Sequence, residues 1–429
     1  METSGSDELP VDIVYNILSR MPIKSLARFQ CVSKVWCKYI NDTYFETMHN
    51  AKRGAMKVDP TMLMMFQLDL YPYASSSLTM LVTNEGEKSA TTHEEVVIAT
   101  KNPPPYMEFG CKDWGPRFIL EDIILGSCKG LIFSSQDNNV DDRSTVLLVI
   151  NPLKRKCYKL PPIKIWSCTS SAFQEREACG LGYDDSTNTY KMVCVVLRNQ
   201  DKIRSYDHDD DDVVKEDLCT VVHDVVLGGT ANSSSSSSSW RKIPALPAYP
   251  ISGEAVFANG CLHWLVSILL EYWPSNAVGK VVCFDLTKEE FGLIDPRNTL
   301  IRMGREHLVD LDGQVGLVYD DISTRHTSCI EVWLLNHETK CWVLHCRFDR
   351  KPPLRHNTFI KVIGYWNKDA GDLLITDTTC RRRLFIYRLK QGVLHEANFI
   401  YQGYLATTTN IRLYQPTFSS ILRRSINNR

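Results

Sequence analysis

The chain has 429 residues, of which 44% are hydrophobic and 23% charged, the usual balance of a soluble globular protein. Its net charge is −1, so no global field favours binding to nucleic acid or to an anionic membrane surface. The N-terminal residues lack the pattern of a secretory signal, and no apolar run is long enough to span a membrane. We therefore expect neither a nucleic-acid partner nor a membrane partner.

Residues 9–42 predict three short amphipathic helices. Pro10 suits the first turn of a helix, where its missing N–H costs little, and Pro22 ends that helix and opens the second. Ser33 is a good N-cap for the third helix. The apolar positions at helical spacing within this stretch are Ile13, Val14, Ile17, Leu18, Met21, Leu26, Phe29, Trp36, Tyr39 and Ile40. A unit of this size cannot bury all these apolar faces by itself. We therefore interpret it as a docking module.

This stretch resembles the F-box, and the run Cys31–Lys34 is similar to the plant version of that motif. The resemblance implies that the helices bind a Skp-type adaptor protein, which links the chain to a cullin ubiquitin ligase. The plainer alternative is a three-helix cap that packs on its own protein. The ordered combination of prolines, leucines and tryptophan favours the docking module over this alternative. The residues that the resemblance assigns to adaptor binding are Leu9, Pro10, Ile13, Ile17, Leu18, Met21, Pro22, Leu26, Phe29, Val32 and Trp36.

Beyond about residue 60 the apolar pattern changes to period two, which is typical of β-strands. Residues 330–335 and 384–389 alternate in this way, and several such strands are apolar on both faces, as expected for covered strands. Residues 61–105 are expected to add further strands. Long helical patterns are absent from this part of the sequence.

A loose repeat runs through these strands, marked by glycines at positions 130, 182, 260, 313 and 371. Their spacings are 52, 78, 53 and 58 residues, and a strand-rich repeat near 50 residues predicts a β-propeller. The longest interval contains an acidic run at 207–212 and a serine run at 233–239, so we predict a disordered insertion near residues 201–239. The acidic run lacks the glycine and terminal glutamate of a calcium loop.

The stretches 126–132, 150–162, 180–193, 258–266 and 284–291 resemble the F-box-associated, or kelch-like, domain of a large plant family. The double glycine of true kelch repeats is missing. The expected organisation is mainly β: a three-helix F-box at residues 1–50, and a propeller-like substrate-recognition domain at residues 60–421. The segment 410–421 resembles the closing segment of that family.

Two stretches resemble catalytic or binding motifs. The segment Gly126–Gly130 fits G-x-C-x-G, a cysteine version of a nucleophile elbow, but the strand-like residues that follow favour a turn between strands. The pair His263 and Trp264 is a candidate for a recognition surface, with packing between sheets as the plainer alternative.

The 15 cysteines form no C-x-x-C pair, which favours reduced thiols and a location in the cytoplasm or nucleus. Cys341, His345 and Cys346 come closest to a metal-ligand cluster but alternate as in a strand. We therefore expect no metal, cofactor or catalytic residue.

The combined resemblance implies a non-catalytic substrate-recognition subunit of a Skp–cullin–F-box ubiquitin ligase complex, which presents an unknown target protein for ubiquitination and degradation. Two other classes remain open. One is a non-degradative scaffold or small-ligand sensor on the same adaptor. The other is an enzyme with catalytic groups in the central channel of the propeller.

Overall fold

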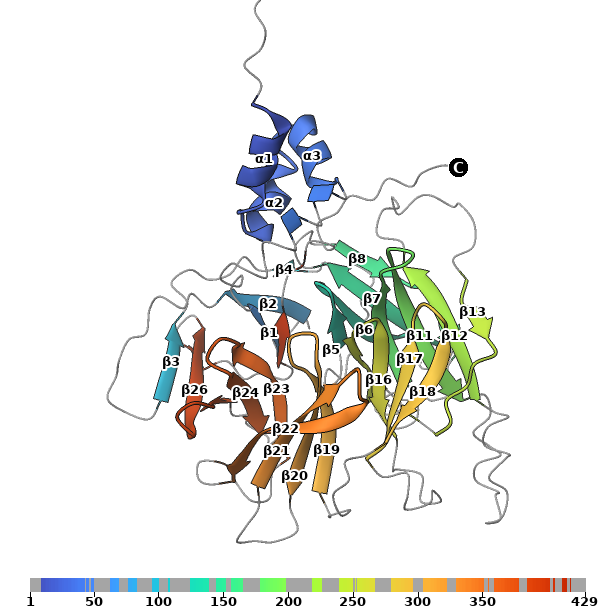
Figure 1. Cartoon of the computed structure of the whole chain (residues 1–429), viewed down its shortest axis with the longest axis vertical. Helices are drawn as coiled ribbons and strands as arrows, with labels where there is room; N and C mark the ends of the chain where they lie inside the picture. The colour runs from blue at the N-terminus through green and yellow to red at the C-terminus, as the bar shows by residue number, and fades with distance from the viewer. Residues whose placement is uncertain are drawn as a thin grey trace, which may run out of the picture.

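Figure 1 shows the computed structural model of the chain, in which three helices lie outside a ring of β-sheets. The residues that the structure describes are 9–42, 44–45, 48–49, 62–68, 76–82, 95–99, 107–108, 124–138, 144–151, 156–164, 178–197, 218–225, 239–249, 251, 253–266, 279–295, 304–321, 329–350, 354, 359–377, 384–401, 404–405, 411–414 and 417.

The helices begin where the sequence predicts. They are α1 (Val11–Leu18), α2 (Ile23–Phe29) and α3 (Lys34–Ile40). Pro10 and Pro22 directly precede the first two. The Pro10 carbonyl oxygen accepts hydrogen bonds from the N–H groups of Ile13 and Val14, and the Pro22 carbonyl oxygen accepts them from Ser25 and Leu26. The Ser33 hydroxyl accepts a hydrogen bond of 3.0 Å from the backbone N–H of Trp36, which caps the third helix. No described helix is long and apolar enough to cross a membrane.

Strands dominate the rest of the described chain, which confirms the predicted mainly-β propeller. Five sheets follow one another along the sequence. The first contains β5 (Ile124–Cys128), β6 (Leu131–Asn138), β7 (Ser144–Asn151), β8 (Lys156–Lys159) and β9 (Ile163–Lys164). The second contains β10 (Ala178–Asp184), β11 (Thr189–Leu197), β12 (Leu218–Val225), β13 (Arg241–Ile243) and β14 (Gly253–Glu254). The third contains β15 (Val256–Ala258), β16 (Cys261–Leu265), β17 (Val281–Asp285) and β18 (Glu290–Ile294).

The fourth sheet contains β19 (Gly304–Asp310), β20 (Val315–Asp321), β21 (Cys329–Asn336) and β22 (Cys341–Asp349). The fifth contains β23 (Ile360–Asn367), β24 (Asp372–Asp377), β25 (Leu384–Arg388), β26 (Val393–Tyr401) and β27 (Tyr404–Leu405), with β3 (Glu95–Ala99) parallel to β26. A further sheet joins β1 (Met62–Leu68), β2 (Ser76–Val82) and β4 (Met107–Glu108) to β28 (Ile411–Tyr414).

The two ends of the strand region close the ring. Strand β28 pairs antiparallel with β1, with Met62 opposite Tyr414. The Tyr414 hydroxyl then donates a hydrogen bond of 3.0 Å to the carbonyl oxygen of Gly130, in the first of the five sheets. The ring therefore depends on contacts between residues that are far apart in the sequence.

The predicted insertion near residues 201–239 needs a correction, because β12 lies within it. Strand β12 pairs with β11 over its whole length and also with β13, so it is an integral part of its sheet. Its sequence, LCTVVHDV, has the apolar character of a covered strand. The prediction missed this strand because the adjacent acidic and serine runs are typical of an insertion. The acidic run and residues 233–238 of the serine run lie outside the described residues. Strands β1, β2 and β3 agree with the expectation for residues 61–105.

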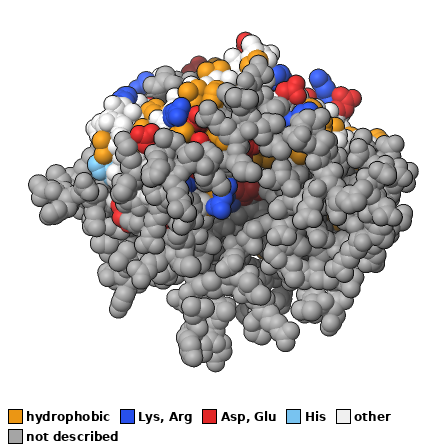
Figure 2. Space-filling model, turned by 90° about the horizontal axis from the view of Figure 1, so that it is seen from below, with side chains coloured by type: hydrophobic (Ala, Val, Ile, Leu, Met, Phe, Trp, Pro, Cys, Tyr) orange, Lys and Arg blue, Asp and Glu red, His pale blue; other side chains and the backbone are white. Residues whose placement is uncertain are grey.

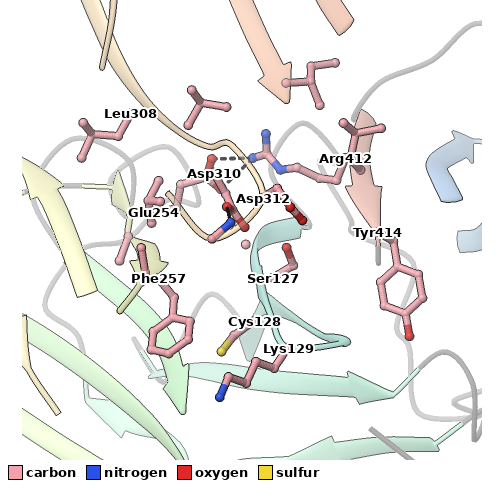
Figure 3. Close-up of a pocket in the computed structure, with 18 of the residues that line it drawn as sticks. Ser127, Cys128, Lys129, Glu254, Phe257, Leu308, Asp310, Asp312, Arg412 and Tyr414 are labelled. Atoms are coloured by element: carbon pink, nitrogen blue, oxygen red, sulfur yellow. Dashed lines mark hydrogen bonds and ion pairs between the residues drawn. The ribbon is translucent and has the colours of Figure 1, made fainter. Parts of the chain in front are cut away.

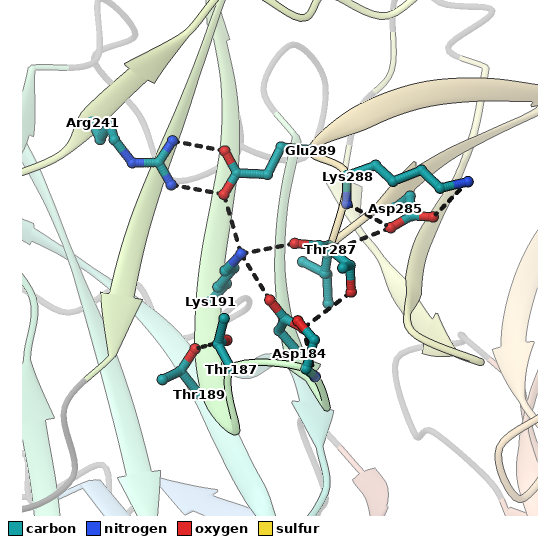
Figure 4. A network of polar contacts seen from close by, with 11 residues as sticks. Asp184, Thr187, Thr189, Lys191, Arg241, Asp285, Thr287, Lys288 and Glu289 are labelled. Carbon is teal, nitrogen blue, oxygen red and sulfur yellow. Dashed lines mark hydrogen bonds and ion pairs between the residues drawn. The ribbon is translucent and has the colours of Figure 1, made fainter.

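A polar network connects the second and third sheets (Figure 4). The Lys191 Nζ lies 3.0 Å from a carboxylate oxygen of Asp184 and 3.1 Å from one of Glu289. Arg241 donates to both oxygens of Glu289 at 2.7 Å, which is a bidentate pair. Burial by itself would raise the pKa of Asp184, but hydrogen bonds from Ser186 and Lys191 outweigh it and hold the pKa below its ordinary value. The network thus ties β10, β11 and β13 to the turn between β17 and β18.

Close packing between these two sheets requires a glycine at position 180. A Cβ atom there would lie 2.6 Å from the Cβ of Ala255 and 3.1 Å from Leu262 and Trp264. We expect Gly180→Ala to lower the free energy of unfolding by about 1–3 kcal/mol, because overpacking forces the backbones apart. Urea denaturation measures this loss. The double variant Gly180→Ala/Ala255→Gly should recover much of it, and an unchanged midpoint in the single variant would show that the sheets can separate at no cost.

Candidate functional site

The helical bundle has a small core of its own. The side chains buried in it are Tyr15, Leu18, Ile23, Leu26, Ile40 and Phe45. Phe29 and Trp36 pack against this core with their rings edge to face, at a centroid distance of 5.2 Å. The bundle therefore has a hydrophobic centre built from its own helices.

A partly buried hydrogen bond fixes the end of the bundle. The Tyr15 hydroxyl donates to the carboxylate of Asp42 at 2.6 Å, which ties α1 to the residues after α3. Burial and this hydrogen bond raise the pKa of Tyr15 to about 12, so the hydroxyl keeps its proton and remains a donor.

Apolar side chains also project into solvent from the same bundle. The exposed fractions are 60% for Leu9, 46% for Ile13, 49% for Ile17 and 65% for Val32. Ile13 and Ile17 are four residues apart and share one face of α1. Several large exposed aliphatic residues on so small a unit are typical of a protein-interaction surface.

The structure divides the eleven predicted adaptor-binding residues into three groups. Leu9, Pro10, Ile13, Ile17, Pro22 and Val32 are exposed. Met21, Phe29 and Trp36 are half-buried. Leu18 and Leu26 are fully buried in the core of the bundle, where they stabilise the helices and present no surface to a partner in this conformation.

Three exposed apolar residues of the bundle were not predicted. Val11, Val35 and Tyr44 are 43%, 51% and 64% exposed. Val35 lies three residues after Val32 and four before Tyr39, so helical spacing could have revealed it. Tyr44 lies five residues after Tyr39, so periodicity does not reveal it. Val11 lies three residues before Val14 and seven before Leu18, so helical spacing could have revealed it as well.

The cysteine of the G-x-C-x-G stretch is not a free nucleophile. Cys128 ends β5, a turn follows at Lys129 and Gly130, and β6 then begins, so the stretch is a turn between strands as predicted. The Cys128 side chain is buried, and burial raises the pKa of its thiol well above the ordinary value. The thiol therefore stays protonated and is a poor nucleophile.

The pair His263 and Trp264 lies inside the protein rather than on a recognition surface. Trp264 is fully buried and donates its indole N–H to the carbonyl oxygen of Cys179, in the neighbouring sheet. His263 is buried beside His337, and burial lowers the pKa of His263 to about 4. Both residues therefore pack between sheets.

Charged side chains of both signs are interspersed among the coloured residues of the face seen in Figure 2. Hydrophobic side chains are mixed with them. This view agrees with the near-zero net charge, because it shows no large area of a single sign among the described residues.

Comparison with known proteins accounts for both parts of this structure. Residues 6–47, which include the three helices, match the F-box domain. Residues 115–395, which include the first four of the five consecutive sheets and β23 to β25 of the fifth, match the F-box associated beta propeller domain. The chain belongs to the F-box-associated β-propeller family. Its F-box is the helical bundle with the exposed apolar residues, and its propeller is the ring of sheets.

Proteins similar to this chain are found in Arabidopsis thaliana. The F-box protein At2g23160 is 25% identical over 76% of this chain and 91% of the relative. The putative F-box protein At1g53550 is 23% identical over 98% of this chain and 92% of the relative. The F-box/kelch-repeat protein At4g19930 is 24% identical over 77% of this chain and 67% of the relative.

Two solved structures are similar to the chain at low identity. A putative 6-phosphogluconolactonase from Bacteroides fragilis covers 83% of this chain, with a TM-score of 0.37, 9% identity and 98% of its own chain matched. The SapL1 lectin in complex with alpha methyl fucoside covers 79% of this chain, with a TM-score of 0.35, 9% identity and 95% of its own chain matched.

Proposed function

We propose that this chain is the substrate-recognition subunit of a Skp–cullin–F-box ubiquitin ligase complex. In this proposal the F-box binds a Skp-type adaptor, the adaptor connects it to a cullin, and the propeller binds a target protein. The observation that carries the proposal is the set of exposed apolar side chains on the F-box, with Val32, Tyr44 and Leu9 the most exposed.

The energetics of such docking are ordinary. Fully burying one aliphatic side chain contributes roughly 1.5–3 kcal/mol. Leu9, Ile13, Ile17 and Val32 are each close to half exposed or more, so covering them offsets much of an association cost of about 4–15 kcal/mol. The half-buried Met21, Phe29 and Trp36 would complete the contact.

In this role the chain acts by tethering rather than by catalysis. Holding a target on the same assembly as the ubiquitin-transferring subunits raises its effective concentration near them. We also propose that it works in the cytoplasm or nucleus, on the basis of its cysteine usage. The buried, protonated thiol of Cys128 is consistent with a non-catalytic role.

Replacing Leu9 and Pro10 together by Ala tests the docking surface. We expect the affinity for a purified Skp-type adaptor to fall by about a hundredfold or more, because two apolar contacts are lost. The carbonyl group of residue 10, which accepts the N–H groups of Ile13 and Val14, is retained in the variant. The bundle should therefore stay folded, with an unchanged melting temperature.

The matched control is Leu293→Ala/Val343→Ala, which truncates two exposed apolar residues on β18 and β22 of the propeller. This control should bind the adaptor as the intact chain does. Undiminished adaptor capture by the Leu9/Pro10 variant would refute the proposed docking surface.

Targets can then be sought by affinity purification with the proteasome blocked. Proteins retained by both the intact chain and the Leu9/Pro10 variant are the candidates.

A further inference from the structure

The F-box carries an excess of positive charge in its middle part. Residues 13–41 contain no aspartate or glutamate, but they contain Arg20, Lys24, Arg28, Lys34 and Lys38. At the average content of the whole chain, which has 50 acidic residues in 429, about three acidic residues would be expected in this stretch. The excess is local, because the net charge of the whole chain is −1.

Four of these cations project into solvent. They are the exposed side chains of Arg20, Arg28, Lys34 and Lys38. No carboxylate of a described residue forms an ion pair with any of the four. The Arg20 Nε donates a hydrogen bond of 3.3 Å to the side-chain oxygen of Asn16, which is neutral. These four charges are therefore not neutralised by direct contact within the described F-box.

The acidic residues that border the stretch do not offset this charge. Asp12 is eight residues from Arg20, about 12 Å along the helix axis, which exceeds the Debye length of about 8 Å at physiological salt. The Asp42 carboxylate accepts hydrogen bonds from the Tyr15 hydroxyl at 2.6 Å and from the Tyr44 N–H at 2.9 Å. The hydrogen bond from Tyr15 is the main cause of the lowered pKa of Asp42, and the charge of Lys38 is the smallest.

On α1 the cation lies on the same face as the exposed apolar residues. Arg20 follows Ile17 by three residues and Ile13 by seven, which is the spacing of one helix face. The helical turn continues beyond α1, since the Arg20 N–H donates a hydrogen bond of 3.2 Å to the Ile17 carbonyl oxygen. Arg20 therefore borders the apolar face that Ile13 and Ile17 form.

The exposed valines of the bundle also have cations beside them. On α3, Val35 directly follows Lys34 and precedes Lys38 by three residues. Arg28, in the last turn of α2, precedes Val32 by four residues, and hydrogen-bonded turns connect the two. Apolar side chains with charged groups at their edge match the anatomy of a protein interface, whose centre is apolar and whose rim is polar.

The charges of the central cavity, by contrast, balance. This cavity of about 510 Å³ is lined by four basic and four acidic side chains (Figure 3). Glu254 is paired with Arg412 and Lys361, and Asp185 is paired with Lys129. The protein itself compensates these charges, so they indicate no charged ligand. The unpaired cations of the F-box do indicate one.

A partner protein fits this surface better than a membrane does. Amphipathic helices with basic residues also bind anionic membrane surfaces. In this F-box, however, acidic residues adjoin the apolar ones, since Asp12 precedes the exposed Ile13, and Glu8 precedes the exposed Leu9. Anionic headgroups would repel both acidic residues, whereas a folded partner can place carboxylates opposite the cations alone.

We propose that the adaptor surface that covers this F-box carries carboxylates around its apolar contact, and that Arg20, Arg28, Lys34 and Lys38 steer the adaptor to it. This inference rests on the proposed receptor function and names the chemistry of the partner at the same site. Charges at the rim of an interface act mainly on the rate of association, and salt screens them. The exposed apolar side chains then determine how slowly the complex dissociates.

Stopped-flow association of the full chain with a purified Skp-type adaptor tests this steering. Salt is raised from about 0.01 M to about 1 M, which shortens the Debye length from about 30 Å to about 3 Å. The association rate constant should fall by about tenfold or more, with the dissociation rate constant nearly unchanged. Lys34→Gln/Lys38→Gln keeps the helix propensity of both positions and should lower the low-salt association rate constant by about tenfold.

The matched control is Lys288→Gln/Arg347→Gln, which removes two cations of the propeller that are 72% and 54% exposed. This control changes the net charge equally and should associate as the intact chain does. Arg20→Gln/Arg28→Gln is a second, independent pair on the F-box and should lower the rate as Lys34→Gln/Lys38→Gln does. A rate that is independent of salt, undiminished rates in both F-box variants, or an equal fall in the control would overturn the proposal.

The receptor function and this inference can fail separately. If the intact chain does not capture the adaptor at any salt concentration, the receptor function fails and this inference fails with it. Capture at a salt-independent rate overturns the steering alone. Binding of the chain to vesicles that contain phosphatidylserine, if it is lost in Lys34→Gln/Lys38→Gln, would assign these cations to a membrane surface and would also contradict the proposal.

Discussion

Arg350→Met is expected to lower the free energy of unfolding by about 3–5 kcal/mol, because it leaves the Asp320 carboxylate buried without its cation. Both side chains are completely buried, and Arg350 donates a hydrogen bond to Asp320. Burial raises the pKa of Asp320 even in the presence of Arg350, so the carboxylate has little other compensation. The pair also lies where β20 approaches β23, since the Ile360 N–H points to the same carboxylate at 3.4 Å.

Urea denaturation of the purified chain measures this effect. The matched control is Arg347→Met, at an arginine that is 54% exposed and 3.7 Å from Glu331, where we expect a loss of at most about 1 kcal/mol. The double variant Asp320→Leu/Arg350→Met should be more stable than Arg350→Met alone, because it removes the stranded charge. Equal losses in Arg350→Met and Arg347→Met would contradict this account of the buried pair.

Leu26→Ala is expected to destabilise the F-box by about 2–5 kcal/mol, because it opens a cavity in the small core that contains Tyr15, Ile23 and Ile40. Such a loss is comparable to the stability of so small a unit. Hydrogen exchange of residues 9–42 should therefore lose protection, while the strands of the propeller keep theirs. Adaptor binding should be lost as a consequence of unfolding.

Ile17→Ala is the matched comparison, because Ile17 is a similar aliphatic residue on the same bundle but is 49% exposed. We expect its stability to change by less than about 0.5 kcal/mol, with protection retained and adaptor affinity reduced. If Leu26→Ala kept full protection but lost the adaptor, Leu26 would have to contact the partner directly.

Local sequence patterns predicted the helices well, because a helix start depends on residues within one turn of it. Pro10, Pro22 and Ser33 each mark such a start, and each lies directly before a helix. The strands were predicted for the same reason, since alternation is a short-range property. The prediction was wrong at β12 because of the sequence on either side of it. The acidic and serine runs there favoured an insertion, so the eight residues of the strand were included in that insertion.

The repeat glycines illustrate a limit of sequence patterns. Gly130, Gly260, Gly313 and Gly371 all lie in the turn between two strands of a sheet and have positive φ angles. Gly182 has the same approximate spacing in the sequence but lies inside β10, where a Cβ would collide with Leu286 of the next sheet. Equal spacing therefore concealed two different physical reasons for glycine.

The sequence by itself determined that this protein has three short helices followed by a strand repeat, and that the helices carry more apolar side chains than they can bury. Only the tertiary structure decided that Leu18 and Leu26 form the core of the bundle while Leu9 and Val32 face solvent. It also decided that β28 returns to pair with β1. These features depend on contacts between distant segments, which no pattern of neighbouring residues encodes.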